Sequence, residues 1–240
     1  MNDFKFKKKY GQNFLQNKNI IKKIALKADA IPNSLIIEVG PGSGNLTVAL
    51  AELYSDSKIL AYEIDTSLED ILADKCFNYK NIEVVFSDFL NTNLVEDVNK
   101  YSYAALYFVS NVPYYITTPI LFKLIDSGLP FEKIVMMVQK EVGDRFTCLP
   151  SNKEYSAITV MLNYFFYIKK EFPVDRNQFY PRPNVDSVVV SFTRKDCQES
   201  LVDKELFKKV VHDSFQFKRK TLRNNLKKYN LNIISNVLNN

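Results

Sequence analysis

A predicted strand that ends in an amide, a proline and an aromatic ring carries the most distinctive chemistry of this sequence. The apolar run 104–109 is followed directly by Ser110, Asn111, Val112, Pro113 and Tyr114. An exocyclic aromatic amine is a weak nucleophile because its lone pair is delocalised into the ring. Two acceptors, the side-chain oxygen of Asn111 and the backbone carbonyl of Val112, would take its two hydrogens and favour the pyramidal amine of the transition state. Pro113 stiffens the turn, and Tyr114 offers a face for base stacking worth ~1–3 kcal/mol.

This stretch therefore favours a site for a nucleobase amine. The alternative is an ordinary strand-to-helix turn with a tyrosine in the core. The surrounding sequence decides between the two, because a site needs other polar groups brought to the same place.

The elements that must position this stretch alternate along the first half of the chain. Strands are predicted at 35–39, 59–63, 82–86, 104–109 and 133–138. Helices are predicted at 17–28, 46–54, 65–76 and 117–126. Such alternation predicts an α/β fold built from right-handed βαβ units, with a parallel sheet covered by helices on both faces.

Polar or glycine-rich segments follow four consecutive predicted strands. The first strand runs into Gly40-Pro41-Gly42-Ser43-Gly44, and the next three end at Glu63, Asp88 and Asn111. In open parallel sheets, ligands bind outside the carboxyl ends of the strands. We therefore expect these groups to line one shared site.

The glycine loop allows two cofactor interpretations. A glycine-rich turn after a strand, with an acid about twenty residues on, is typical of dinucleotide-binding proteins, but here Asn45 stands where their third glycine is expected. The other cofactor is S-adenosylmethionine, whose amino-acid end the glycine backbone would approach. Glu63 would then accept the ribose hydroxyls, and Asp88 would accept the adenine amine. The spacing favours the sulfonium cofactor.

Charge is distributed unevenly along the 240 residues, whose formal net charge is +5. Residues 1–27 hold eight Lys and one Asp, and residues 194–240 hold eleven Lys or Arg and five acids, so the middle is net negative. Basic ends around an acidic body suggest a polyanionic partner, although a solvated lysine-rich surface gives the same pattern. The three cysteines, Cys76, Cys148 and Cys197, are widely spaced and favour neither disulfides nor zinc, so we expect a cytoplasmic protein. The sequence holds no apolar run of about 18 residues, so we expect no membrane span.

The last third of the sequence changes character. Helices are predicted at 139–146 and 156–162, and two extended segments, 163–168 and 185–192, can pair antiparallel at the edge of the sheet. Residues 179–183 between them form a proline-containing loop. Helices are then predicted at 203–215 and 218–228.

Seven motifs, in order over nearly the whole chain, resemble those of the ribosomal RNA adenine dimethyltransferase family. They are Gly11-Gln12-Asn13-Phe14-Leu15, Glu38-Val39-Gly40-Pro41-Gly42, Tyr62-Glu63-Ile64-Asp65, Asn111-Val112-Pro113-Tyr114, Gln139-Lys140-Glu141-Val142, Phe179 to Ser187, and Phe217 to Leu226. The glycine motif is common to many proteins, whereas the set as a whole is specific.

The resemblance implies a Rossmann-like S-adenosylmethionine-dependent methyltransferase domain over 1–195. It also implies a small α-helical RNA-binding domain over 196–240. The implied reaction transfers four methyl groups to N6 of two adjacent adenosines in the 3′-terminal hairpin of 16S rRNA, within an immature small ribosomal subunit. We expect a monomer that needs neither metal nor membrane.

Site residues follow from the same resemblance. The implied cofactor contacts are Asn13, Leu15, Gly40, Gly42, Glu63, Asp88 and Asn111. The implied catalytic group is Asn111, Val112, Pro113, Tyr114 and Phe179, with Tyr114 and Phe179 sandwiching a flipped adenine. RNA contacts are implied for Lys218, Arg219, Lys220 and Arg223. Some of these residues have a simpler alternative: Glu63 and Asp88 as caps, Phe179 as a core residue, and the cations as solvated surface.

The sequence departs from the family pattern at a few positions beside the amide. Ser110, Val112, Tyr115 and Thr117 stand where Gly, Leu, Asn and Ser are usual. Tyr115 is the largest change, and it can narrow the pocket that accepts a second methyl group. The chain also ends at Asn240, before a typical member would.

Two other functions stay open from the sequence. One is the related 23S rRNA adenine methylation that confers macrolide resistance. The other is a ribosome-assembly factor whose methylation is incidental.

Overall fold

The computed structural model describes residues 13–195, 203–230 and 232–233. The predictions that fall on Gly11, Gln12, the lysines before them and Cys197 lie outside these ranges. Contacts divide the chain into two compact units, one of 1–143 with 168–194 and the other of 144–167 with 195–240. Each unit is described by itself.

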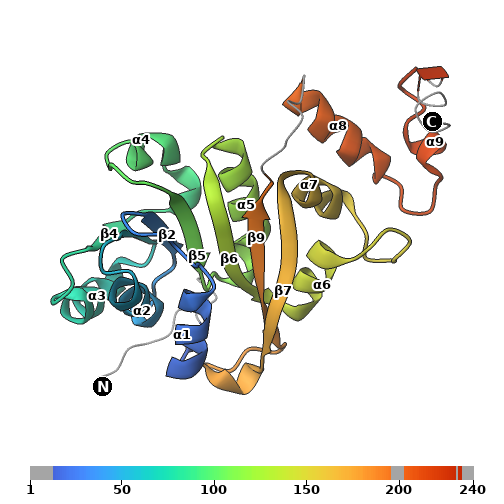
Figure 1. Ribbon diagram of the computed structural model, residues 1–240. Helices are drawn as coiled ribbons and strands as arrows, with labels where there is room; N and C mark the ends of the chain where they lie inside the picture. The colour runs from blue at the N-terminus through green and yellow to red at the C-terminus, as the bar shows by residue number, and fades with distance from the viewer. Residues whose placement is uncertain (1–12, 196–202, 231, 234–240) are drawn as a thin grey trace. The chain divides into compact units, whose positions relative to one another are not determined.

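A seven-stranded sheet forms the first unit's framework within the described residues, and its strands lie side by side in Figure 1. The strands are β2 (Leu35–Val39), β3 (Lys58–Glu63), β4 (Ile82–Phe86), β5 (Leu106–Ser110), β6 (Phe131–Gln139), β7 (Phe166–Val174) and β9 (Ser187–Arg194). Their order is β4-β3-β2-β5-β6-β9-β7. The five strands from β4 to β6 are parallel, as the alternation predicts, and β9 is antiparallel to β6.

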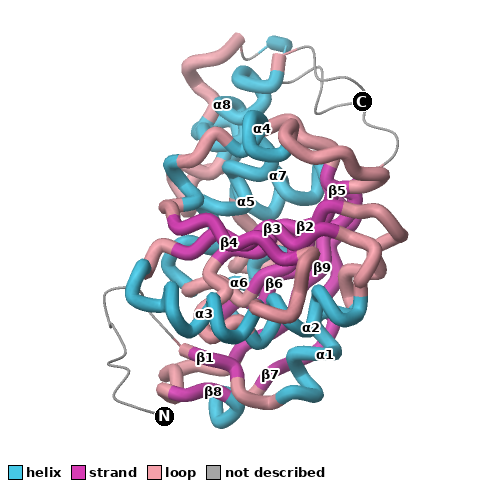
Figure 2. Tube along the Cα trace, turned by 90° about the vertical axis from the view of Figure 1, so that its left-hand side faces the viewer, coloured by secondary structure: helices cyan, strands magenta, loops and turns pink. Residues whose placement is uncertain are grey.

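Every residue of the central strands β2 and β5 is buried. A parallel strand with helices on both sides has no solvated face, so it is mostly apolar rather than alternating, and the polar exceptions, Glu38 and Ser110, lie near the strand ends. Figure 2 shows α1, α2 and α3 on one face of the sheet and α4 and α5 on the other. Their bounds are α1 Lys18–Leu26, α2 Asn45–Leu53, α3 Glu69–Cys76, α4 Leu94–Val98 and α5 Thr117–Asp126.

Two short strands are not predicted by the sequence. β1 (Phe14–Leu15) pairs antiparallel with β8 (Phe179–Tyr180), where the prolines predict only a loop. The pairing places Leu15 opposite Phe179 and brings the start of the described chain to a segment some 160 residues away. A two-residue strand is too short to show a period, so the sequence carries no signal for it.

The second unit differs from the predicted C-terminal domain because it includes 144–167. Within it, α7 (Ala157–Phe165) packs on α8 (Lys204–Ser214), with the rings of Tyr164 and Phe207 4.7 Å apart. A further helix, α6 (Lys140–Thr147), begins in the first unit and ends in this one. The apolar contact between α7 and α8 explains why the helical segment before residue 168 groups with the C-terminal one.

The predicted helix 218–228 is wrong in extent. The structure has a turn over 216–220 and then α9, which spans only Leu222–Asn225. The Asn225 side chain donates to the carbonyls of Phe217 and Lys220 and accepts from the amide of Phe217. These hydrogen bonds replace the helical ones and hold the basic segment as a loop.

Candidate functional site

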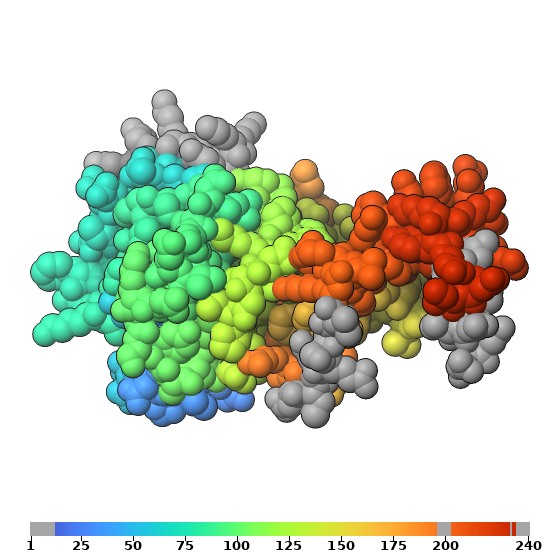
Figure 3. All heavy atoms as spheres, turned by 90° about the horizontal axis from the view of Figure 1, so that it is seen from above, coloured from blue at the N-terminus to red at the C-terminus, as the bar shows by residue number. Residues whose placement is uncertain are grey.

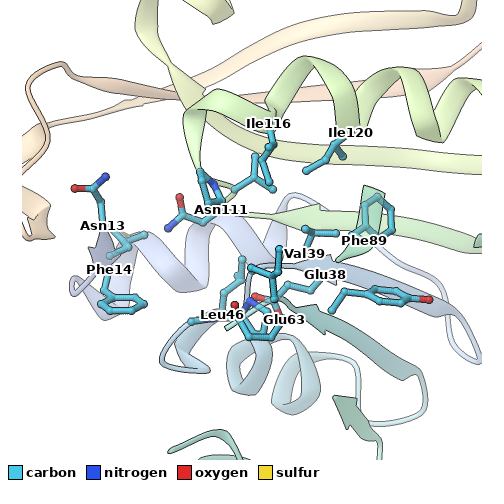
Figure 4. Close-up of a pocket in the computed structure, with 18 of the residues that line it drawn as sticks. Asn13, Phe14, Glu38, Val39, Leu46, Glu63, Phe89, Asn111, Ile116 and Ile120 are labelled. Atoms are coloured by element: carbon cyan, nitrogen blue, oxygen red, sulfur yellow. Dashed lines mark hydrogen bonds between the residues drawn. The ribbon is translucent and has the colours of Figure 1, made fainter. Parts of the chain in front are cut away.

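A cavity of about 240 Å³ lies at the carboxyl ends of β2, β3, β4 and β5 in the first unit (Figure 4). β2 and β5 are neighbours in the sheet although other strands separate them in sequence. That reversal of strand order is where open α/β sheets bind ligands. The residues predicted to meet at the four strand ends all line it: Gly40, Gly42, Glu63, Asp88 and Asn111.

The glycine loop after β2 needs its glycines for two physical reasons. Gly40, Gly42 and Gly44 have φ of 71°, 57° and 75°, a region that L side chains rarely adopt. A Cβ added at Gly42 would also lie 2.5 Å from Cε1 of Phe14. Gly42 therefore lets the β1 segment close over the loop.

Glu63 holds the glycine loop through its carboxylate at the end of β3. Oε2 accepts from the amide of Gly42 at 3.1 Å, and Oε1 accepts from that of Asp65 at 2.9 Å. Burial raises the pKa of Glu63, and these two amides oppose the rise. A carboxylate has about four acceptor positions, so the group can cap the loop and still accept from a ligand hydroxyl.

Asp88, at the end of β4, has the same double placement. Oδ1 accepts from the amide of Leu90 at 3.0 Å, and Oδ2 accepts from Nδ2 of Asn91 at 2.8 Å, so Asp88 caps a short 3-10 helix, Phe89–Asn91. Asp88 also lines the cavity. Capping and ligand binding, which are alternatives from the sequence, are compatible in this geometry.

Glu38 is a cavity-lining acid for which the sequence predicts no role of its own. It lies on β2, is 1% exposed, and its Oε2 has no hydrogen-bond partner among the described residues. Burial raises its pKa to about 8, and the charge of Glu63 adds to the rise. The signal in the sequence is an acid inside the otherwise apolar run 35–39.

Replacing Glu38 by Gln is expected to flatten the dependence of stability on pH. Between its ordinary pKa of 4.5 and about 8, the folded chain keeps a proton that the unfolded chain loses. Stability of the wild type therefore falls as pH rises through this window, by at most ~1.4 kcal/mol per pH unit from this group. Melting temperatures of the cofactor-free proteins at pH 5 to 8 should diverge in favour of the variant. Parallel curves would show that Glu38 is ionised throughout.

The loop after β5 is held on both sides of Asn111. The Ser110 hydroxyl donates to the carbonyl of Val39, which ties β5 to β2 at the cavity edge. The Tyr114 hydroxyl lies 2.7 Å from that of Ser187 on β9. Figure 4 shows Asn111 on the same side of the cavity as Asn13. The amide thus faces the cavity from a turn that is fixed at each end.

The structure brings most, but not all, of the predicted residues together. Asn13, Leu15, Val112, Pro113 and Tyr114 line the cavity with the strand-end groups. Phe179 does not line it: the ring is 5% exposed and belongs to the core cluster with Leu15. Tyr115 lines the cavity and is 60% exposed.

The second unit presents the predicted RNA-binding cations on the turn and α9. Lys218, Arg219, Lys220 and Arg223 are exposed, and none forms an ion pair with a described acid. Nζ of Lys220 lies 4.5 Å from the ring centroid of Phe217, which is 48% exposed. The segment belongs to the orange-to-red surface in Figure 3. Because these cations have no described acid partner, they can bind phosphates without first breaking an ion pair.

Two further properties concern the described ranges alone. No His, Cys, Asp and Glu side chains there gather in a group that could hold a metal ion. No helix there is long and apolar enough to cross a membrane.

Comparison with known proteins identifies a family match over almost the whole chain. The family described as ribosomal RNA adenine dimethylase matches residues 3–238. The chain is 42% identical over 227 residues to the ribosomal RNA small subunit methyltransferase A of Lactococcus lactis, covering 93% of this chain and 76% of that protein. It is 43% identical over 229 residues to the protein of the same name from Streptococcus gordonii, covering 94% and 78%.

Solved structures show the same fold. A dimethyladenosine transferase from Plasmodium falciparum superposes with a TM-score of 0.76 at 31% identity, covering 89% of this chain and 74% of that one. The 23S rRNA methyltransferase ErmE superposes with a TM-score of 0.71 at 28% identity, covering 95% and 89%. The Rossmann-like methyltransferase fold implied by the sequence is therefore confirmed.

Proposed function

Because this chain belongs to the ribosomal RNA adenine dimethylase family, we propose that it methylates N6 of two adjacent adenosines in the 3′-terminal hairpin of 16S rRNA. The enzyme is an S-adenosylmethionine-dependent rRNA adenine methyltransferase. Its substrate would be an immature small ribosomal subunit, on which it acts as a cytoplasmic monomer. The observation that carries the proposal is the fixed Asn111 turn at the rim of the cavity.

The cavity fits S-adenosylmethionine by the chemistry of its donor set. Gly40 and Gly42 line the cavity without a Cβ, and Glu63 has acceptor positions beyond its two amide bonds. Oε2 of Glu38 is a buried oxygen without a partner among the described residues. Glu63 would hold the ribose hydroxyls, and Asp88 would hold the adenine amine. Asn13, Leu15 and Gly40 would contact the rest of the cofactor. When bound, the cofactor supplies an electrophilic methyl group on a positively charged sulfur.

The chain's own contribution to the chemistry is to localise the lone pair of the target amine. The side-chain oxygen of Asn111 and the carbonyl of Val112 accept its two hydrogens, which favours the pyramidal nitrogen of the transition state. The target base must leave its stack to reach them, and Tyr114 offers it an aromatic face. The Tyr114–Ser187 hydrogen bond fixes that ring before the base arrives.

Phe179 is not exposed to the cavity, so its proposed stacking on the base requires the β1–β8 pair to shift. Tyr114 therefore supplies the preformed part of the base site. The exposed Tyr115 beside it narrows the entrance for an amine that already carries one methyl group.

Identity favours the small-subunit substrate over the large-subunit one. The relatives named for the small subunit are 42–43% identical to this chain, whereas the 23S rRNA methyltransferase ErmE is 28% identical. The test offers tritiated cofactor with immature small subunits and, separately, with naked 23S rRNA. Label is expected in the small subunits, and label in 23S rRNA alone would overturn the proposal.

Removing the cations of the C-terminal loop is expected to weaken RNA binding and its dependence on salt. The plot of log K against log salt has a negative slope, and its magnitude decreases by about 0.7–0.9 for every phosphate that the protein no longer neutralises, because fewer counterions are released. We expect a stepwise decrease in this magnitude along a series of variants in which alanine replaces Lys218, then Lys218 and Arg219, and then also Lys220. A slope that stays constant along this series would show that the loop does not touch phosphates.

A further inference from the structure

Lys123 makes polar contacts to the wall of the cavity but does not itself line the cavity. It lies on α5, and its Nζ donates to the carbonyls of Leu90 at 3.0 Å and Thr92 at 2.6 Å. The same nitrogen lies 5.4 Å from the ring centroid of Phe89. One ammonium group thus holds three parts of the segment that follows β4.

The segment held by Lys123 is the wall predicted to face the adenine of the cofactor. Asp88, Phe89 and Leu90 all line the cavity. Phe89 is 3% exposed and meets the ring of Tyr62 edge-on, with centroids 5.2 Å apart. The Tyr62 hydroxyl in turn donates to Asp97 at 3.0 Å. The wall is therefore held by the packing of Phe89 on Tyr62 and, on the side of α5, by Lys123.

The two carbonyls need this partner because the helix they end is too short to satisfy them. Within the 3-10 turn, the amides of Asn91 and Thr92 donate to the carbonyls of Asp88 and Phe89. The carbonyls of Leu90 and Thr92 lie beyond these bonds, and cations near helix C-termini are favourable partners for such groups. Without Lys123, the wall loses its only described side-chain donor to both carbonyls.

We propose that Lys123 is a positioning residue that sets recognition of the adenine end of the cofactor by holding the Asp88–Thr92 wall. The inference rests on the proposed role of Asp88 as acceptor for the adenine amine. It assigns Lys123 no contact with the cofactor or with RNA. Loss of the ammonium should therefore change how well adenine is recognised, and leave the transfer step itself in place.

The test compares two ligands in calorimetry on the full chain: S-adenosylhomocysteine and S-inosylhomocysteine, in which a carbonyl replaces the adenine amine. Lys123→Met keeps the length of the side chain and removes its donors. It is expected to weaken binding of S-adenosylhomocysteine about tenfold, which corresponds to about 1.4 kcal/mol. Binding of S-inosylhomocysteine should weaken much less, so the preference for adenine falls. The rate of methyl transfer at saturating cofactor should stay within about twofold of wild type.

Matched variants separate this role from general destabilisation. Lys123→Arg keeps several donors and should restore most of the preference, and Lys123→Gln gives a second measurable variant if Lys123→Met does not fold. Lys58→Met removes a lysine that pairs with Glu83 at 3.1 Å at the opposite end of β3, and it should leave both affinities unchanged. Equal weakening of both ligands, or no weakening, in the Lys123 variants would overturn the proposal.

Failure of the underlying site assignment gives a different result. Asp88→Ala should by itself abolish the preference for adenine. If Asp88→Ala keeps the preference while wild type shows it, the assignment of Asp88 is wrong, whatever Lys123 does.

Discussion

Replacing Asn111 by Ala is expected to lower the rate of methyl transfer about 10²–10³-fold at saturating cofactor and RNA. The variant leaves the carbonyl of Val112 as the remaining acceptor, so one amine hydrogen has no partner and the lone pair stays delocalised. Single-turnover transfer of tritium from the cofactor to small subunits measures the effect. The neighbouring turn should survive, because the Ser110 and Tyr114 side chains hold it independently of the amide.

Binding provides the control for this variant. Affinity for small subunits should stay within a few-fold of wild type, since Asn111 lines the cavity of the first unit and the basic loop belongs to the second unit. A variant that transfers methyl groups at more than about a tenth of the wild-type rate would show that Asn111 is not the main acceptor of the amine.

Replacing Gly42 by Ala is expected to weaken cofactor binding by at least about tenfold. The added Cβ would lie 2.5 Å from the Phe14 ring, so that ring must move, and we expect the β1 segment to move away from the glycine loop with it. That movement shifts Asn13 and Leu15, which line the same cavity. Calorimetric titration with S-adenosylhomocysteine measures the weakening.

Gly128→Ala is the matched control for Gly42→Ala. Gly128 has φ of 69°, so alanine there carries the same backbone strain of roughly 1–2 kcal/mol, but nothing lies within 4 Å of its added Cβ. It should lower the melting temperature and leave cofactor affinity unchanged. Equal affinities for Gly42→Ala and wild type would mean that the β1 segment does not form the cofactor site.

The convergence of the site could be predicted because parallel strands bring their carboxyl ends to one edge. Four strands can be predicted from their apolar runs, and they are followed by the glycine loop, Glu63, Asp88 and Asn111. The structure places these four groups at one cavity. Neither contact geometry nor strand order was needed for that prediction, only the direction of each strand.

Other features depend on pairings between distant residues, which a period cannot reveal. Phe179 lies in the core because β8 pairs with two residues near the other end of the chain. The predicted helix 218–228 is broken because one side chain, Asn225, bonds four backbone atoms of Phe217, Lys220 and Thr221. The lack of a described partner for Oε2 of Glu38 is likewise a product of packing. So are the hydrogen bonds from Lys123 to Leu90 and Thr92.

Mapping the methylated nucleotides tests the central claim most directly. Small subunits that lack these modifications would be incubated with the enzyme and S-adenosylmethionine, and their 16S rRNA analysed by primer extension and by mass spectrometry of nuclease fragments. Two adjacent N6,N6-dimethyladenosines in the 3′-terminal hairpin are the predicted result. Methylation confined to any other site, or to large-subunit rRNA, would contradict the account.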